Sequence, residues 1–140
     1  GAARSLAVPL LRGVWAGAIP DATNTAWVDR IAALPRSDSP YGDYGPLVRK
    51  MLDAGLSQRE IARFAQIVGY ETAGTICYLF DDPNASVEGF DDVDDVDELS
   101  WGLFETDPAT DEPLRRMGSL HELLLGLDPS GHEMFPRDGV

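Results

Sequence analysis

Residues 46–80 read PLVRKMLDAGLSQREIARFAQIVGYETAGTICYLF, and this part of the chain carries its clearest helix signals. Pro46 suits the first turn of a helix, because its missing N–H would have no partner there. Gly55 suits the left-handed position just past a helix end. The apolar residues between them recur at intervals of three or four, which is typical of an amphipathic helix. These signals predict a helix over 46–54.

A second helix start follows at once. Ser57 and Glu60 have the spacing of a capping box, in which each side chain accepts a hydrogen bond from the backbone N–H of the other residue. Gly69 is a weak helix former and is expected to break or kink the helix that begins there. We therefore expect two further helices, over 57–68 and 70–80.

These helices are expected to pack together through their apolar faces, along with a helix over 24–34 that Asn24 or Thr25 can cap. The apolar positions expected to face inward are Trp27, Val28, Ile31, Leu34, Leu47, Val48, Met51, Leu52, Ile61, Phe64, Ala65, Val68, Ala73, Ile76, Cys77 and Phe80. Helices of this length are stabilised mainly by burying such faces. The pattern therefore predicts that all four helices share one core.

The N-terminal part of the chain is less regular. Residues 1–22 contain Pro9 and Pro20 and show no clear apolar period, so we expect an irregular arm there. Residues 35–45 are dense in Pro, Gly, Asp and Ser and predict a loop.

The C-terminal part carries a strand signal and a last helix. In 101–117, two short apolar runs flank turn-forming residues, which predicts a β-hairpin. Ser119 and Glu122 repeat the capping-box spacing ahead of a helix over 120–127. Residues 132–140 are expected to form a loose tail.

The expected fold is mainly α: a compact bundle of four to five short helices with one small β-hairpin near 101–117. A chain of 140 residues lies close to the commonest domain size. We therefore expect a single helical domain over 23–131 that includes an acidic segment, 81–112.

Charge is the unusual feature of this sequence. It has 11 Lys and Arg against 24 Asp and Glu, a formal net charge of −13. Within 81–112 there are 13 acidic residues and no Lys or Arg. Such a field repels nucleic acid and anionic membranes and attracts basic proteins. No apolar run approaches the roughly 20 residues of a membrane span, and we expect a cytoplasmic protein with no nucleic-acid or membrane partner.

Patterns for metal binding or catalysis are absent or incomplete. His121, His132 and Cys77 are the only residues of their kinds, too few for a tetrahedral zinc site of N and S ligands. The aspartate-rich run 91–98 has no Gly where a calcium-binding EF-hand loop requires one. Glycine-rich phosphate loops and the G-x-S-x-G nucleophile elbow are also missing. We therefore expect no metal, no cofactor and no enzymatic activity, a buried thiol and two surface histidines.

One stretch suggests DNA binding. Residues 56–63, LSQREIAR, resemble the opening of a helix-turn-helix module of bacterial repressors. That resemblance implies a Gly four residues after Ala62 and a polar recognition helix, but Gln66 occupies the position and 70–80 contains no Lys or Arg. The departures, together with the net negative charge, disfavour DNA binding.

The acidic segment holds the candidate partner-binding residues, because large apolar side chains alternate there with carboxylates. These residues are Phe90, Asp91, Asp92, Asp94, Asp95, Asp97, Glu98 and Trp101. Two interpretations stay open. The run is either the solvated face of a helical turn anchored on the core or an interface in which carboxylates steer a basic partner toward an aromatic anchor.

The function expected from these observations is protein binding. The leading hypothesis is an inhibitor or immunity-type protein that neutralises a basic partner, such as a nuclease toxin, by covering its cationic cleft. The alternative is a regulatory or scaffold module that binds a protein through its neutral helical half, 25–80.

Overall fold

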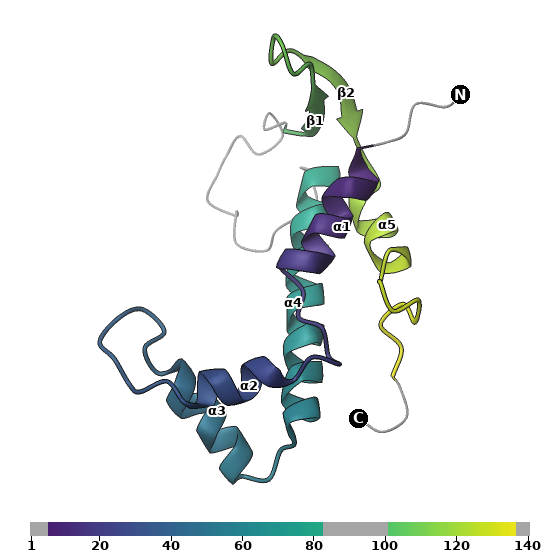
Figure 1. Ribbon diagram of the computed structural model, residues 1–140. Helices are drawn as coiled ribbons and strands as arrows, with labels where there is room; N and C mark the ends of the chain where they lie inside the picture. Colours follow the sequence, from purple (N-terminus) through teal and green to yellow (C-terminus); the bar gives the residue numbers. More distant parts are fainter. Residues whose placement is uncertain (1–5, 83–100, 137–140) are drawn as a thin grey trace, which may run out of the picture.

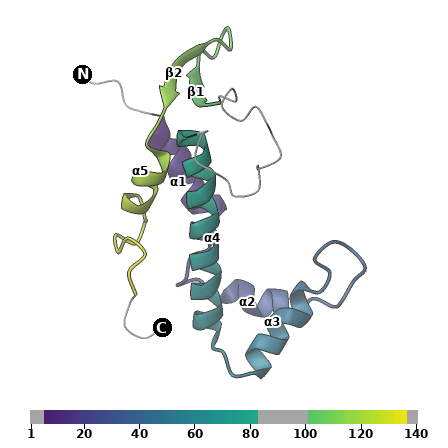
Figure 2. The ribbon, with the colours of Figure 1, turned by 180° about the vertical axis from the view of Figure 1, so that it is seen from behind.

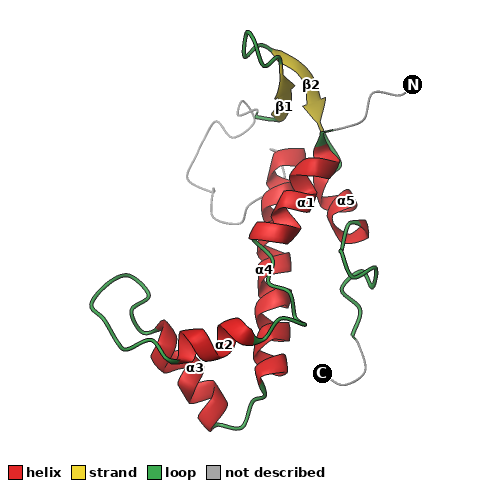
Figure 3. Cartoon of the chain, viewed as in Figure 1, coloured by secondary structure: helices red, strands yellow, loops and turns green. Residues whose placement is uncertain are grey.

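The computed structural model describes residues 6–82 and 101–136, and within them it confirms a mainly helical fold with one small hairpin (Figures 1 and 3). In chain order the elements are α1 (Ala7–Gly17), α2 (Ala26–Ala32), α3 (Tyr44–Asp53), α4 (Gln58–Asp81), β1 (Leu103–Thr106), β2 (Pro113–Met117) and α5 (Leu120–Gly126). No helix among the described residues is both long and apolar enough to cross a membrane.

α4 is the axis of the molecule. Figures 1 and 2 show α1 and α5 beside one half of α4, with the hairpin beyond that end, and α2 and α3 projecting sideways from the other half. The helices consequently pack around two separate groups of buried side chains, and the expectation of one shared core is wrong.

We call the two groups the long-range core and the local core. The long-range core joins α1, α4 and α5 and contains Ala7, Leu11, Trp15, Ile19, Ala73, Cys77, Leu120 and Leu124. The local core joins α2, α3 and the first turns of α4 and contains Val28, Val48 and Ile61. The two groups occupy opposite halves of α4. Ile61 belongs to the local core, Ala73 and Cys77 belong to the long-range core, and more than three helical turns separate Ile61 from Ala73.

The expected irregular arm over 1–22 is wrong over Ala7–Gly17, which forms α1, whereas residues 18–22 contain no helix or strand. Ala7, Leu11 and Trp15 follow one another at intervals of four residues and are buried on one face. Pro9 is the third residue of α1, where the N–H that it lacks would have no partner within the helix. Pro9 was one reason to expect an irregular segment, but it lies at a position where a helix tolerates proline.

The expected break at Gly69 is also wrong, because α4 runs without interruption from Gln58 to Asp81. A Cβ at position 69 would lie 2.9 Å from Cδ of Pro20, in the link between α1 and α2. Gly69 thus allows the link to pass close to α4. The continuous helix also departs from the helix-turn-helix resemblance, which requires a turn between two helices.

The helix start at Ser57 is confirmed. Oγ of Ser57 accepts from the Glu60 N–H at 3.1 Å, and Oε2 of Glu60 accepts from the Ser57 N–H at 2.7 Å. These bonds favour the ionised carboxyl, so the pKa of Glu60 lies below its ordinary value. Gly55, with φ of +98°, has the expected left-handed conformation after α3.

The hairpin is confirmed as an antiparallel pair, with Leu103 opposite Met117 and an irregularity between Glu105 and Thr106. Glu105 forms an ion pair with Arg115 across the strands at 2.7 Å. Its Oε1 also accepts from the Leu6 N–H at 2.9 Å, which ties the hairpin to the start of α1. The Arg115 side chain and the Leu6 N–H both lower the pKa of Glu105.

Candidate functional site

Most of the predicted partner-binding residues lie outside the described residues: Phe90, Asp91, Asp92, Asp94, Asp95, Asp97 and Glu98. Trp101 is described, and 40% of its surface is exposed. Its indole Nε1 donates to the Leu79 carbonyl oxygen at 2.7 Å. This bond fixes one edge of the ring at the last turn of α4 while the rest of the side chain stays accessible.

An apolar row lies on α4, and we call it the α4 ridge. It consists of exposed side chains spaced four residues apart, Phe64, Val68, Thr72, Ile76 and Phe80, four apolar and one a threonine, and it winds around the helix by about 40° per step. Phe64 is 59% exposed and Ile76 is 49% exposed, so their expected places in the core are wrong. The apolar period was genuine, but the two cores use other faces of the helix.

Along the sequence of the α4 ridge the charge is negative, although Arg63 directly precedes Phe64 and Arg116 donates to the Trp101 carbonyl oxygen at 3.5 Å. Residues 64–82 contain Glu71, Asp81 and Asp82 and no Lys or Arg. Trp101 lies near the end of the α4 ridge, because its indole bonds to the carbonyl oxygen of Leu79, the residue before Phe80.

Asp81 joins α4 to α5. Its Oδ1 accepts from the Leu120 N–H at 3.0 Å and its Oδ2 from the His121 N–H at 2.9 Å, while Nδ1 of His121 lies 2.5 Å from Oδ2. The cap of α5 expected from Ser119 is wrong, since Ser119 has φ of 57° and no side-chain cap bond. Burial opposes ionisation of Asp81, but the two N–H groups and the imidazole outweigh it and lower the pKa.

The buried thiol expected at Cys77 is confirmed. Burial raises the pKa of Cys77, and the nearby charge of Asp81 raises it further. A thiol with a raised pKa is a poor nucleophile. His132 is exposed as expected, whereas His121 is half-buried against Asp81 and Tyr78, its ring edge-on to the tyrosine at 4.9 Å between centroids.

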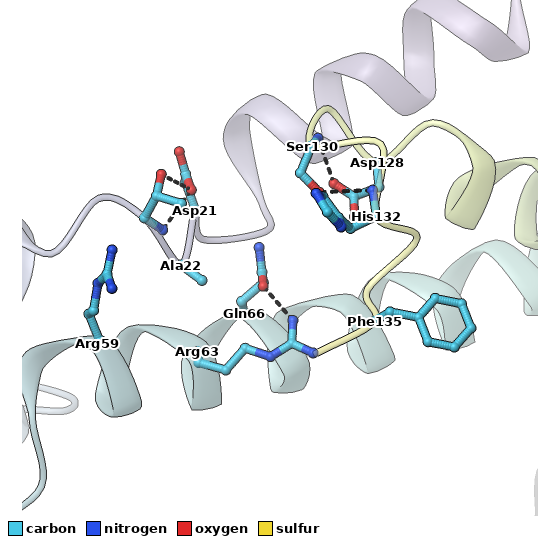
Figure 4. Close-up of a pocket in the computed structure, with 10 residues that line it drawn as sticks. Asp21, Ala22, Arg59, Arg63, Gln66, Asp128, Ser130, His132 and Phe135 are labelled. Atoms are coloured by element: carbon cyan, nitrogen blue, oxygen red, sulfur yellow. Dashed lines mark hydrogen bonds between the residues drawn. The ribbon is translucent and has the colours of Figure 1, made fainter. Parts of the chain in front are cut away.

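A pocket of about 110 Å³ lies between α4, the link before α2 and the segment after α5 (Figure 4). We call it the mixed-charge pocket, because it is lined by Asp21, Arg59, Arg63, Gln66, Asp128 and His132, among others. Within the parts of the chain that the structure describes, no group of three or more His, Cys, Asp or Glu is placed to hold a metal ion.

Hydrogen bonds hold the walls of the mixed-charge pocket in place. Arg63 donates to Oε1 of Gln66 at 2.8 Å and to the Met134 carbonyl oxygen at 2.5 Å. Asp128, only 8% exposed, accepts from the N–H groups of Ser130 at 2.9 Å and Met134 at 3.0 Å. The described part of the expected loose tail is therefore fastened to α4.

Backbone conformation is unusual in the segment after α5, between the lining residues His132 and Phe135. Glu133 and Met134 follow one another with φ of 46° and 62°. Two consecutive residues other than Gly in this region carry strain, which concentrates at binding sites. Sequence reasoning missed the pocket because its residues come from three distant segments with no local pattern.

No protein-family model, no curated protein sequence and no solved structure matches this chain.

Proposed function

We propose that this chain is a protein-binding module for a basic partner, and that the α4 ridge and Trp101 form its contact surface. The observation that supports this proposal is the exposed apolar row on α4. Phe64 and Ile76 leave about half of their surface in water, although burying a side chain of this size yields roughly 1.5–3 kcal/mol. A partner that covers the ridge would gain this free energy.

The chemistry of the partner follows from the charge of the chain. With a net charge of −13 and no Lys or Arg over 64–82, the chain attracts a partner whose apolar contact surface is flanked by Lys and Arg. Inhibition of a basic protein such as a nuclease toxin is the form of this function that we favour, since an acidic surface competes with nucleic acid for a cationic cleft.

The second candidate is a regulatory or scaffold module that binds through its helical half, 25–80. The position of the α4 ridge favours it, because the ridge lies wholly within that half. The two candidates differ in their dependence on charge. A steered basic partner associates more slowly as salt rises, whereas a neutral partner does not.

The test uses two synthetic amphipathic helical peptides, one of Leu and Lys and one of Leu and Glu, titrated into the full chain. We expect the Lys peptide to bind and the Glu peptide to bind at least about tenfold more weakly. Phe64→Ser with Ile76→Ser should weaken binding of the Lys peptide by about tenfold or more. Equal binding of both peptides would exclude a basic partner.

The matched control is Leu114→Ser on β2, which removes an apolar side chain that is also exposed. This variant should bind the Lys peptide as the unaltered chain does. If the control lost as much affinity as the ridge variant, binding would depend on general apolar surface and the α4 ridge would not be the site. Melting each free variant first separates loss of binding from loss of fold.

A further inference from the structure

We propose that the mixed-charge pocket binds a small zwitterion, namely a free α-amino acid. Both signs of charge line it, on opposite walls. Figure 4 shows Arg59 and Arg63 on α4 and Asp21 on the link before α2, with Ala22 and Gln66 between them. A carboxylate at the arginines and an ammonium at Asp21 would match this arrangement.

The arginine wall suits a carboxylate. Arg59 and Arg63 are one helical turn apart, so their side chains lie on the same side of α4. A guanidinium group presents planar N–H donors that pair with carboxylates through two bonds. Arg63 is held in place by Gln66 and by the Met134 carbonyl, so the cationic wall is arranged before a ligand arrives.

The carboxylate wall suits an ammonium group. Oδ1 of Asp21 accepts from the N–H of Thr23 at 2.8 Å and from its hydroxyl at 2.7 Å, which orients the carboxylate. Asp128 accepts backbone N–H groups of its own loop through both oxygens, Oδ1 from Ser130 and Oδ2 from Met134, whereas the two bonds from Thr23 to Asp21 both end on Oδ1. Asp21 is therefore the carboxylate that we assign to the ligand. It also disfavours a simple anion, since a second negative charge would be repelled.

The mixed-charge pocket itself has room only for a small charged group. About 110 Å³ is several times the roughly 10–15 Å³ that one water needs, but far below the 300–1,000 Å³ of pockets for drug-sized molecules. A second hollow of about 780 Å³ adjoins it and is lined by Trp15 and Trp27, giving room for a side chain. The two hollows share Asp21, Thr23, Gln66, Asp128, Ser130 and His132.

The experiment titrates the full chain with L-alanine and L-leucine by calorimetry, and compares propionate, ethylamine and inorganic phosphate. We expect at least one amino acid to bind about tenfold or more tightly than each of the other three probes, because only a zwitterion satisfies both walls. The proposal is overturned if neither amino acid binds up to about 10 mM, an affinity weaker than the millimolar range. It is also overturned if propionate, ethylamine or phosphate binds as tightly as the amino acids.

Variants locate the site. Arg59→Gln and Asp21→Asn should each raise the dissociation constant of the amino acid by about tenfold, the effect of losing one charge-assisted contact. Arg36→Gln, an exposed arginine outside the pocket, is the matched control and should bind normally. If Asp21→Asn fails to fold, Arg59→Gln decides alone, since Arg59 is exposed on α4. Unchanged binding by Arg59→Gln would contradict the assignment. These measurements do not involve the α4 ridge, so they stand or fall separately from partner binding.

Discussion

The local core and the long-range core differ in how far along the chain their residues come from. Val28, Val48 and Ile61 of the local core lie within about 35 residues of one another. The long-range core unites Leu11 and Leu124, at the two ends of the described chain. A hydrogen bond also spans this distance in the long-range core, where Nε1 of Trp15 donates to the Leu124 carbonyl oxygen at 2.8 Å. The difference teaches that one helix can support two packing units of unequal size, one assembled from neighbours and one from the chain ends.

The largest expected effect tests whether α1 is part of the long-range core. Leu11→Ala should lower the free energy of unfolding by about 2–5 kcal/mol, because Leu11 is fully buried and its truncation leaves a cavity. Urea unfolding followed by circular dichroism measures this. Leu10→Ala, beside it but 40% exposed, should cost well under half as much. If both variants lost the same free energy of unfolding, α1 would not be part of the long-range core.

A second test addresses the joint between α4 and α5. Asp81→Asn should lower the free energy of unfolding by about 2 kcal/mol at neutral pH, because two N–H groups and an imidazole lose an anionic acceptor. The folded-state pKa of Asp81 is lowered, so its contribution is present above the ordinary value of 3.8 and is lost as pH falls through the folded value, below 3.8.

The measurement for Asp81 is the unfolding free energy between pH 7 and pH 2 in both proteins. The unaltered chain should be more stable than Asp81→Asn at neutral pH. This advantage in unfolding free energy should shrink only below about pH 4, where Asp81 begins to be protonated in the unfolded state. A difference that stays constant down to pH 2 would show that the ionised carboxylate is not the stabilising group.

The local core should respond to truncation on its own. Val48→Ala should lower the free energy of unfolding by about 1–2 kcal/mol. This is less than for Leu11→Ala, because the truncated valine leaves a smaller cavity. Amide hydrogen exchange should then speed up in α2 and α3 and stay unchanged in α1 and α5, as expected for a sub-global opening. Uniformly faster exchange in all five helices would instead mean that both cores unfold as one unit.

The smallest expected effect concerns glycines of α4. Gly74→Ala should stabilise the chain by about 0.5–1 kcal/mol, since alanine favours a helix and nothing lies within 4 Å of the added Cβ. Gly69→Ala should be less favourable by about 1 kcal/mol, because its Cβ would lie 2.9 Å from Pro20. Thermal melting compares the pair. Equal gains at both positions would show that the link to α2 moves away from α4 without cost.

The sequence predicted the local core better than the long-range core. The capping box at Ser57, the left-handed Gly55 and the buried Val28, Val48 and Ile61 rest on local patterns, and the structure confirms them. The error at Gly69 arose because the approach of Pro20 to α4 is a tertiary contact that no local pattern reports.

The site was less predictable than the fold. An apolar period identifies the apolar residues of a helix but not which of them a neighbour covers, so Phe64 and Ile76 were assigned to a core. The mixed-charge pocket needed Asp21, Arg63 and Asp128 to be brought together from three segments, and such convergence leaves no spacing to detect.

The bond between Trp15 and the Leu124 carbonyl has a consequence for the newborn chain. Its two residues lie 109 positions apart, so α1 leaves the ribosome long before its partner α5 is made. At about 5–20 residues per second, roughly 5–20 s pass before that contact can form. During this interval the local core can assemble, while Leu11 and Trp15 still lack the α5 part of their core. Synthesis thus allows the local core to fold before the long-range core, which is complete only after α5 has emerged.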